Sequence, residues 1–479
     1  MSVNTEHPEY QAMKAEWSLV KACASGSREV KALKTDVLPA PGAVKGVYDA
    51  DRYASYLLRA IYTNVTGRTK TGLTGAAFRI PGEIELPSGL QYLEEDADGA
   101  GQSIKQLTKD TFANLLETGR ECLLVDHPSV EEGLTEEQTQ SIRAQAAIKL
   151  YGALSLINWK VDSVGGREVL TLAVLQEQYN GSDEEFLHMP KLQYRVLRLR
   201  DGAYSQQVYR DGNPIEDERF PTQSNGSKFD FIPLFIIGGQ NNDASVDDIP
   251  LSDIAHVNVG HYRNSADLEE SSYIVGQPMI HIDIGDTDAN QWKELNGAEN
   301  GVAFGSNTSV QTVKGSVDMV QVSENQIADK LQERKEGQML ALGAKLVEQR
   351  NPNETAAAAK IDATGENSVL GDLVANVEEG MLRAIEWCGL FMGEQGNITF
   401  ELNRQFFNDE ELTPEQTNAL MAMWQGAAIS KDVLDHNLVK GKVIPDDVDL
   451  KAMNNQIDNE LPEIDLDGGT TEKEKTNDS

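Results

Sequence analysis

Residues 251–366 constrain the fold more than any other stretch, because their sequence predicts two long helices joined by a short β-rich segment. The first helix is predicted over Leu251–Ile274, with Pro250 before its first turn and Pro278 beyond its end. A second helix follows Ser323-x-x-Gln326, which has the spacing of a capping box. Its apolar stripe is Ile327, Leu331, Met339, Leu342 and Leu346. An ordinary helix–strand–helix segment inside a large domain is the alternative interpretation.

The residues between and after these helices have their own patterns. Four β-prone pieces lie between them: Met279–Ile284, Gly301–Phe304, Ser309–Val313 and Asp318–Val322. The polar, Ala-rich loop Asn353–Asn367 follows the second helix. Next, Ser368–Gly393 is predicted as a long amphipathic helix, because apolar residues recur every three or four positions.

The rest of the chain predicts a mixed α+β protein. Helices are expected at Glu9–Ala24, from Asp49 through Val65, around Ile104–Leu115 and from Thr135 to Tyr151, with a loop at Gly67–Gly75. Strands are expected at Glu121–Val125, Asn158–Asp162, Glu168–Leu175, Leu192–Arg200, Ala203–Arg210, Phe229–Ile237 and Ile398–Leu402. Asp201-Gly202 is predicted as a tight hairpin turn. Two short helices, Thr413–Gly426 and Ser430–Leu438, precede an acidic tail that we expect to be disordered.

Charge and cysteine content narrow the function classes. The 479 residues carry 77 acidic and 42 basic side chains, a formal charge of −35. That balance argues against tight, sequence-independent binding to DNA or to an anionic membrane, since such binding needs clustered Lys and Arg. The three cysteines, Cys23, Cys122 and Cys388, are too few and too scattered for a disulfide framework. No signal peptide and no membrane-spanning run is expected.

The search for catalytic motifs is negative for HExxH, GxSxG, GxGxxG, Walker A and paired CxxC patterns. His281, Asp283, Asp286 and Asp288 gather metal-capable groups, yet they lack EF-hand spacing and are interpreted as a solvated turn. An acidic α/β enzyme that uses these carboxylates with a divalent metal is the alternative function. No catalytic residue, cofactor or metal is predicted.

The order of elements resembles the portal, or head-to-tail connector, proteins of tailed double-stranded DNA bacteriophages. The resemblance is carried by Ile249–Pro278, Ser323–Ile361 and Ser368–Gly393, with further likeness in Asp51–Thr69 and Phe112–Pro128. It extends from about Asp49 to Asp447 and rests on the combined order of segments, not on one invariant motif. It implies a non-enzymatic ring, typically of twelve subunits, at one vertex of the capsid in the virion, assembled in the host cytoplasm.

The resemblance also implies a division of the chain. The parts are a wing (1–248), a first stem helix (249–276), a clip (277–322), a second stem helix (323–350), a tunnel loop (351–367), a wing helix and strand (368–408), crown-like helices (409–454) and an acidic tail (455–479). Implied partners are other copies of the chain, DNA passing through without sequence-specific binding, the terminase large subunit, head–tail adaptor or tail proteins, and major capsid and scaffolding proteins. Another ring-forming virion protein without a DNA channel is a further alternative.

Candidate site residues follow from this division. The tunnel-loop candidates are Arg350, Asn353, Glu354, Thr355, Lys360 and Thr364. Candidates for the lumen of the stem are Asp253, Asp267, Glu269, Glu270, Lys330, Arg334 and Lys335. Candidates for terminase or adaptor contact in the clip are Asp283, Asp286, Asp288, Trp292, Lys293 and Glu294. Isolated cations such as Lys360 would touch DNA phosphates only transiently.

Overall fold

The structure is a computed structural model that divides into two compact units, Met1–Phe406 and Phe407–Ser479. It describes residues 2–44, 46–128, 145–276, 279–296, 310–312, 314–320, 327–345, 369–394, 396–404, 406, 414–425, 430–440 and 443–444.

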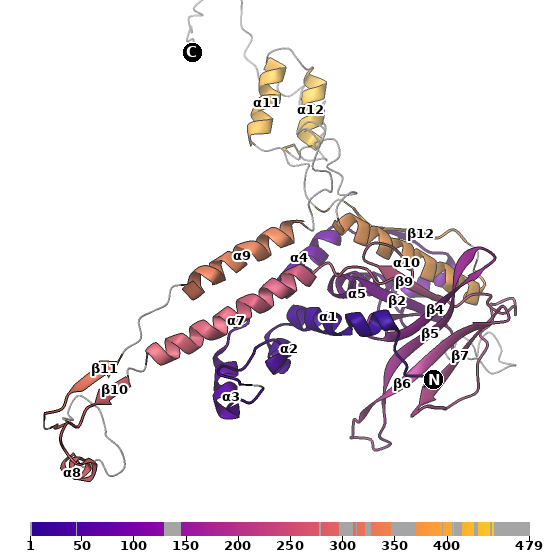
Figure 1. The fold of residues 1–479 in the computed structure, drawn as a ribbon. Coiled ribbons are helices and arrows are strands. Elements are labelled where there is room, and N and C mark those ends of the chain that lie inside the picture. The colour runs from indigo at the N-terminus through magenta and orange to yellow at the C-terminus, as the bar shows by residue number, and fades with distance from the viewer. Residues whose placement is uncertain are drawn as a thin grey trace, which may run out of the picture. The chain divides into compact units, whose positions relative to one another are not determined.

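In its described residues, the first unit combines helices with four small sheets (Figure 1). Its N-terminal helices are α1 (Pro8–Ser25), α2 (Ser27–Ala32), α3 (Ala50–Arg59), α4 (Val65–Ala77) and α5 (Ile104–Thr118). Its later helices are α7 (Ser252–Val275), α8 (Ala289–Leu295), α9 (Ile327–Lys345) and α10 (Val369–Met392). Two 3₁₀ turns, Lys34–Asp36 and Ser88–Glu94, complete the helical part that is described. The mixed α+β class is confirmed.

Two antiparallel sheets form most of the β structure. One sheet has the strand order β3 (Ala147–Gly152), β2 (Arg120–Asp126), β9 (Leu234–Gly238). The other runs in sequence order through β4 (Leu156–Val164), β5 (Arg167–Asn180), β6 (Pro190–Arg200), β7 (Ala203–Arg210) and β8 (Asn213–Pro214). Asp201 and Gly202 both have positive φ, as the predicted tight hairpin turn between β6 and β7 requires. Short pairs join β1 (Glu83–Glu85) to β12 (Thr399–Glu401) and β10 (Met279–Ile282) to β11 (Val317–Val320).

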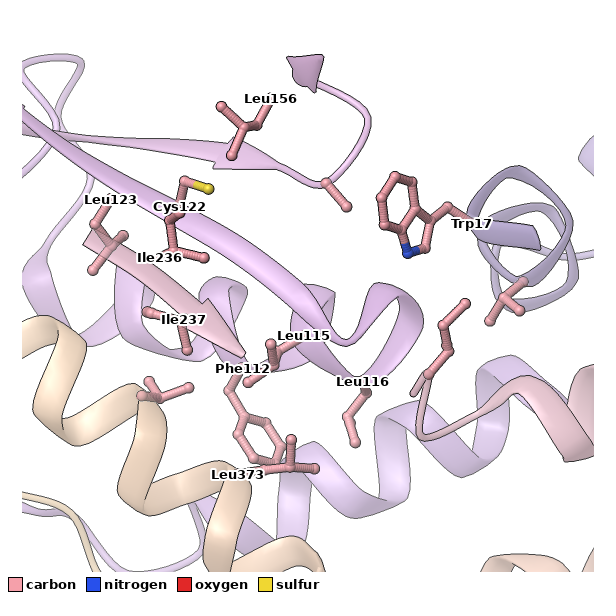
Figure 2. Close-up of a cluster of buried hydrophobic side chains, with 14 of the residues drawn as sticks. Trp17, Phe112, Leu115, Leu116, Cys122, Leu123, Leu156, Ile236, Ile237 and Leu373 are labelled. Carbon is pink, nitrogen blue, oxygen red and sulfur yellow. The ribbon is translucent and has the colours of Figure 1, made fainter. Parts of the chain in front are cut away.

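The core is centred on β2, every residue of which is buried up to Val125. Figure 2 shows Cys122 and Leu123 on this strand beside Ile236 and Ile237 of β9. Helix α5 contributes Phe112, and α10 contributes Leu373, which is 1% exposed. The three-four spacing of apolar residues in α10 therefore serves the core of this unit, as the sequence predicts.

The prediction of a loop at Gly67–Gly75 is wrong, because these residues form most of α4. The expected continuous helix from Asp49 to Val65 is also wrong, since α3 ends at Arg59 and a new helix begins at Val65. Asn64 caps that new helix by accepting a hydrogen bond from the Gly67 amide at 2.8 Å. Glycines and threonines have low helix propensity, but packing against α1, α5 and α7 outweighs it.

The glycines of α4 differ in what surrounds them, which gives a direct test of this packing. A Cβ on Gly67 would lie 2.3 Å from the carbonyl oxygen of Ala24, whereas nothing lies within 4 Å of one on Gly72. We expect Gly67→Ala to lower the free energy of unfolding by about 1–3 kcal/mol. Gly72→Ala, the matched control, should raise it by up to about 1 kcal/mol. Denaturant titration of both variants measures the difference, and equal effects would contradict the close contact.

Other predictions of secondary structure had mixed outcomes. The expected helix from Thr135 to Tyr151 is wrong at its end, where residues 147–151 belong to strand β3; its beginning lies outside the described residues. The strand expected over Phe229–Ile237 is confirmed only after Pro233, which has no N–H to donate to a ladder. The pieces Gly301–Phe304 and most of Ser309–Val313, the capping box at Ser323, and the loop 351–367 lie outside the described part of the chain.

The second unit contains α11 (Pro414–Gln425) and α12 (Lys431–Lys440), which pack against each other. Both helices agree with the sequence prediction. Leu434 is buried in this unit, whereas Met423 and Val433 are exposed. The predicted acidic tail lies outside the described residues.

Candidate functional site

The candidate site is the excursion formed by α7, the β10–α8–β11 segment and α9. Helices α7 and α9 lie side by side, and the chain between them carries β10, α8 and β11 (Figure 1). Lys335 of α9 donates to the carbonyl oxygen of Gly260 at 2.7 Å, which the missing side chain at Gly260 permits. His261 Nε2 lies 3.2 Å from Glu336 Oε1. Polar contacts thus join the helices where the sequence predicts a two-helix stem.

The first half of α7 is anchored in the body of the unit by buried polar residues. The sequence shows Asn258, His261 and Ser265 only as interruptions of an apolar face, yet all three are buried. Asn258 Oδ1 accepts from the Tyr62 hydroxyl at 2.8 Å and from the Thr66 amide and hydroxyl at 3.1 and 3.0 Å. Its Nδ2 donates to the Thr63 carbonyl at 2.9 Å. One amide therefore joins α7 to the segment that leads into α4.

Helix α3 holds the middle of α7 through carboxylates predicted as lumen candidates. The Tyr56 hydroxyl donates to Asp267 Oδ1 at 2.7 Å. Arg59 pairs with Glu270 and stacks on the Tyr273 ring, with its guanidinium carbon 4.2 Å from the centroid. Sequence reasoning missed these partners, because more than two hundred residues separate them in the chain.

The remaining stem candidates lie in different environments. Asp253, Lys330 and Arg334 are exposed, and Glu269 is half-buried. Lys335 contacts Gly260, and burial together with the nearby Arg263 lowers the pKa of its ammonium group. Asp267, Glu270 and Lys335 thus have partners within the chain, although Asp267 is exposed.

The outer part of the excursion leaves large apolar side chains in solvent. Of the predicted stripe on α9, Ile327 and Leu331 are 64% and 41% exposed, Met339 is buried and Leu342 is partly buried, whereas Leu346 lies outside the described residues. Among the described residues, the exposed large apolar side chains of this outer part are Tyr273, Ile274, Leu295, Val317, Met319, Ile327 and Leu331. Exposed apolar side chains are found at protein–protein contact surfaces when they form a contiguous patch.

The segment expected to be a small β-containing clip also contains a short helix, α8, which the sequence analysis missed. Its signal is Asp288, whose side chain accepts from the amides of Asn290 and Gln291 as an N-cap. Trp292 is 8% exposed and its indole donates to the Gln311 carbonyl at 2.9 Å. Trp292 thus anchors the segment from within, whereas its neighbours Lys293 and Glu294 are exposed.

The acidic residues of this segment do not converge. Asp283 accepts from the Gly285 amide, Asp286 pairs with Lys314 at 3.1 Å, and Asp288 caps α8. Among the described residues there is no group of three or more His, Cys, Asp or Glu side chains placed to hold a metal ion.

The tunnel-loop candidates Arg350, Asn353, Glu354, Thr355, Lys360 and Thr364 lie outside the described residues. Within the part searched, no helix is long and apolar enough to cross a membrane.

Comparison with known proteins gives one family match and several structural likenesses. A domain of unknown function (DUF4055) matches residues 250–392, which run from the start of α7 to the end of α10. No curated protein matches the chain.

Three similar solved structures come from gene transfer agent (GTA) particles. A chain from the virion of the native particle is 15% identical, with a TM-score of 0.38, and 86% of this chain and 98% of that chain are covered. A chain from the neck of the empty particle, computed with C6 symmetry, is 16% identical, with a TM-score of 0.38 and coverage of 83% and 96%. A chain from the neck of the native particle, computed with C12 symmetry, is 15% identical, with a TM-score of 0.39 and coverage of 84% and 96%. With TM-scores below 0.5, these likenesses assign no role to this chain.

Proposed function

We propose that this chain is a portal-type structural protein of a virion, which assembles into a ring around a channel for double-stranded DNA. In this proposal α7 and α9 form the stem, β10, α8 and β11 the clip, and residues 351–367 the tunnel loop. The ring docks a terminase during packaging and an adaptor or tail protein afterwards. The chain acts without catalysis of its own.

The observation that carries the proposal is the set of exposed apolar side chains on the outer part of the α7–α9 excursion. Ile327 and Leu331 on α9 are 64% and 41% exposed, although α9 is bound to α7 on another side. A single copy leaves this surface in water, whereas a neighbouring copy would bury it. A contact that joins different surfaces of two identical subunits closes into a ring when the rotation permits.

The charge of the chain suits a conduit that does not retain DNA. Twelve copies at −35 each give a ring charge of roughly −420, which disfavours persistent binding to phosphates. The polar contacts of Asp267 and Glu270 with α3 leave Asp253, Glu269, Lys330 and Arg334 as the stem residues that we propose for the lumen.

The assembly state of the purified chain tests the proposal. Light scattering and negative-stain electron microscopy should show a ring with a central bore, insensitive to chelators. Ile327→Asp combined with Leu331→Asp should shift the population to smaller species, because charge would enter the buried contact. Gln338→Asp, which adds charge at an exposed polar position on α9, is the matched control and should still assemble. A monomer at tens of micromolar wild-type chain would contradict the ring.

Lys360 is proposed to face the lumen from the tunnel loop. We expect Lys360→Glu rings to assemble normally but to package DNA more slowly, because transient contacts with phosphates become repulsive. Packaging measured with purified terminase and procapsids would reveal the difference. A Lys360→Glu ring that packages DNA at the wild-type rate would exclude a contact role for this side chain.

A further inference from the structure

The loop between β5 and β6, residues 181–189, presents acidic and apolar side chains together. Phe186 is 90% exposed, and Leu187 and Met189 are 42% and 45% exposed. Asp183, Glu184 and Glu185 precede them directly and are also exposed. This β5–β6 loop therefore carries three apolar side chains beside three carboxylates.

The loop is held in shape by its own hydrogen bonds. Asn180 Oδ1 accepts from the Ser182 and Met189 amides at 3.2 and 3.0 Å, and its Nδ2 donates to the Leu187 carbonyl at 3.4 Å. The Gly181 amide donates to the Met189 carbonyl at 2.7 Å. A loop ordered in this way loses little conformational freedom on binding, which favours docking through Phe186.

A hollowed surface with basic side chains, opposite in charge to the β5–β6 loop, lies between α1 and α2. A hollow of about 540 Å³ is lined by the small and apolar residues Ala22, Ala32, Leu33 and Leu154, with Lys21 and Arg28 at the same site. Arg28 is 93% exposed at its side chain, and its Nη2 lies 2.8 Å from Oε1 of its neighbour Glu29. An exposed pair of this kind is weak, so Arg28 can exchange its partner for another carboxylate.

We propose that the β5–β6 loop of one copy docks into this α1–α2 hollow of a second copy. Phe186 would enter the apolar floor, and Glu184 or Glu185 would meet Arg28 and Lys21. The inference deepens the proposed function and rests on it, since it names one contact between neighbouring subunits. Loop and hollow are different surfaces of the same chain, so the contact is head-to-tail, as closure into a ring requires.

Engineered cysteines test this contact in the full-length chain. The native cysteines Cys23, Cys122 and Cys388 are buried, and burial raises the pKa of the Cys23 thiol to about 11, so they will not interfere. A Phe186→Cys/Ala32→Cys variant treated with a short bis-maleimide should give a ladder of cross-linked multimers on denaturing gels. The yield should exceed that of a Phe186→Cys/Lys109→Cys control at least tenfold, because Lys109 is exposed elsewhere on α5.

Charge reversal gives a second readout at the same contact. Arg28→Glu in the Phe186→Cys/Ala32→Cys background should lower the cross-linking yield several-fold, and Glu184→Arg should restore it. Rings in the microscope without the ladder would overturn this contact while leaving the ring proposal intact. Cross-linking by Phe186→Cys alone would also overturn it, because that result requires a loop-to-loop contact. Wild-type chain that forms no ring would remove both proposals.

Discussion

Asn258→Ala is expected to lower the free energy of unfolding by about 3–5 kcal/mol, the largest effect we foresee for one side chain of α7. Asn258 is fully buried, and it bonds to Tyr62, Thr63 and Thr66 at once. Alanine removes both the acceptor and the donor, and it leaves the amide of the fully buried Thr66 without the acceptor that Asn258 provides. Denaturant-induced unfolding followed by circular dichroism measures the loss.

Tyr62→Phe provides a graded comparison for this prediction. It removes one hydroxyl while keeping the ring that packs edge-on against Tyr262, with centroids 5.7 Å apart. We expect a loss of about 1 kcal/mol, well below that of Asn258→Ala. Equal losses for the two variants would mean that Asn258 does not act as the centre of this network.

Asn258 also shows why the sequence reveals the helices of the stem better than their contacts. The flanking prolines Pro250 and Pro278 predict the limits of α7 to within a residue or two, because proline acts on the local backbone. A buried Asn is indistinguishable from an exposed one in the sequence. Its burial depends on Tyr62 and Thr66, almost two hundred residues earlier in the chain.

The same limit explains the errors in the N-terminal half. Gly67–Gly75 looks like a loop by intrinsic propensity, and only contacts with α1, α5 and α7 stabilise it as helix α4. The short helix α8 is signalled by Asp288 alone, because seven residues are too few for a clear periodicity. Asp267 and Glu270 were predicted as lumen candidates from their position on one helix, and their binding to α3 depends on tertiary structure.

Helix α3 therefore helps to fix the position of α7. It binds α7 through Tyr56 and Arg59 at positions that follow the buried first half of α7, so its contacts extend the anchored length of that helix. The outer apolar residues begin beyond this point, with Tyr273 and Ile274. In the proposed ring, α3 would hold the root of each stem while the outer turns contact neighbouring copies.

Glu121 gives the protein a stability that depends on pH. This carboxyl lies on β2 in the centre of the core and is completely buried. Burial raises its pKa to about 8, against the opposing effects of Lys21 and of hydrogen bonds from Thr118 and Asn114. Because the pKa of Glu121 in the folded chain is above the ordinary value of 4.5, the stability that this carboxyl contributes is fully present below about pH 4.5. That stability is lost as pH rises toward 8.

Glu121→Gln should remove this loss, because the amide cannot ionise and keeps an oxygen that can accept from Thr118. At pH 8.5 the variant should be more stable than the wild type by about 3 kcal/mol. This is the order of magnitude that the raised pKa gives at about 1.4 kcal/mol per pKa unit, after the cost of burying the amide is subtracted. Near pH 5 that gain should vanish, which makes the pH series its own control. Denaturant titrations of both proteins from pH 5 to 8.5 measure the divergence. Parallel pH profiles would show that Glu121 is ionised or solvated within the fold.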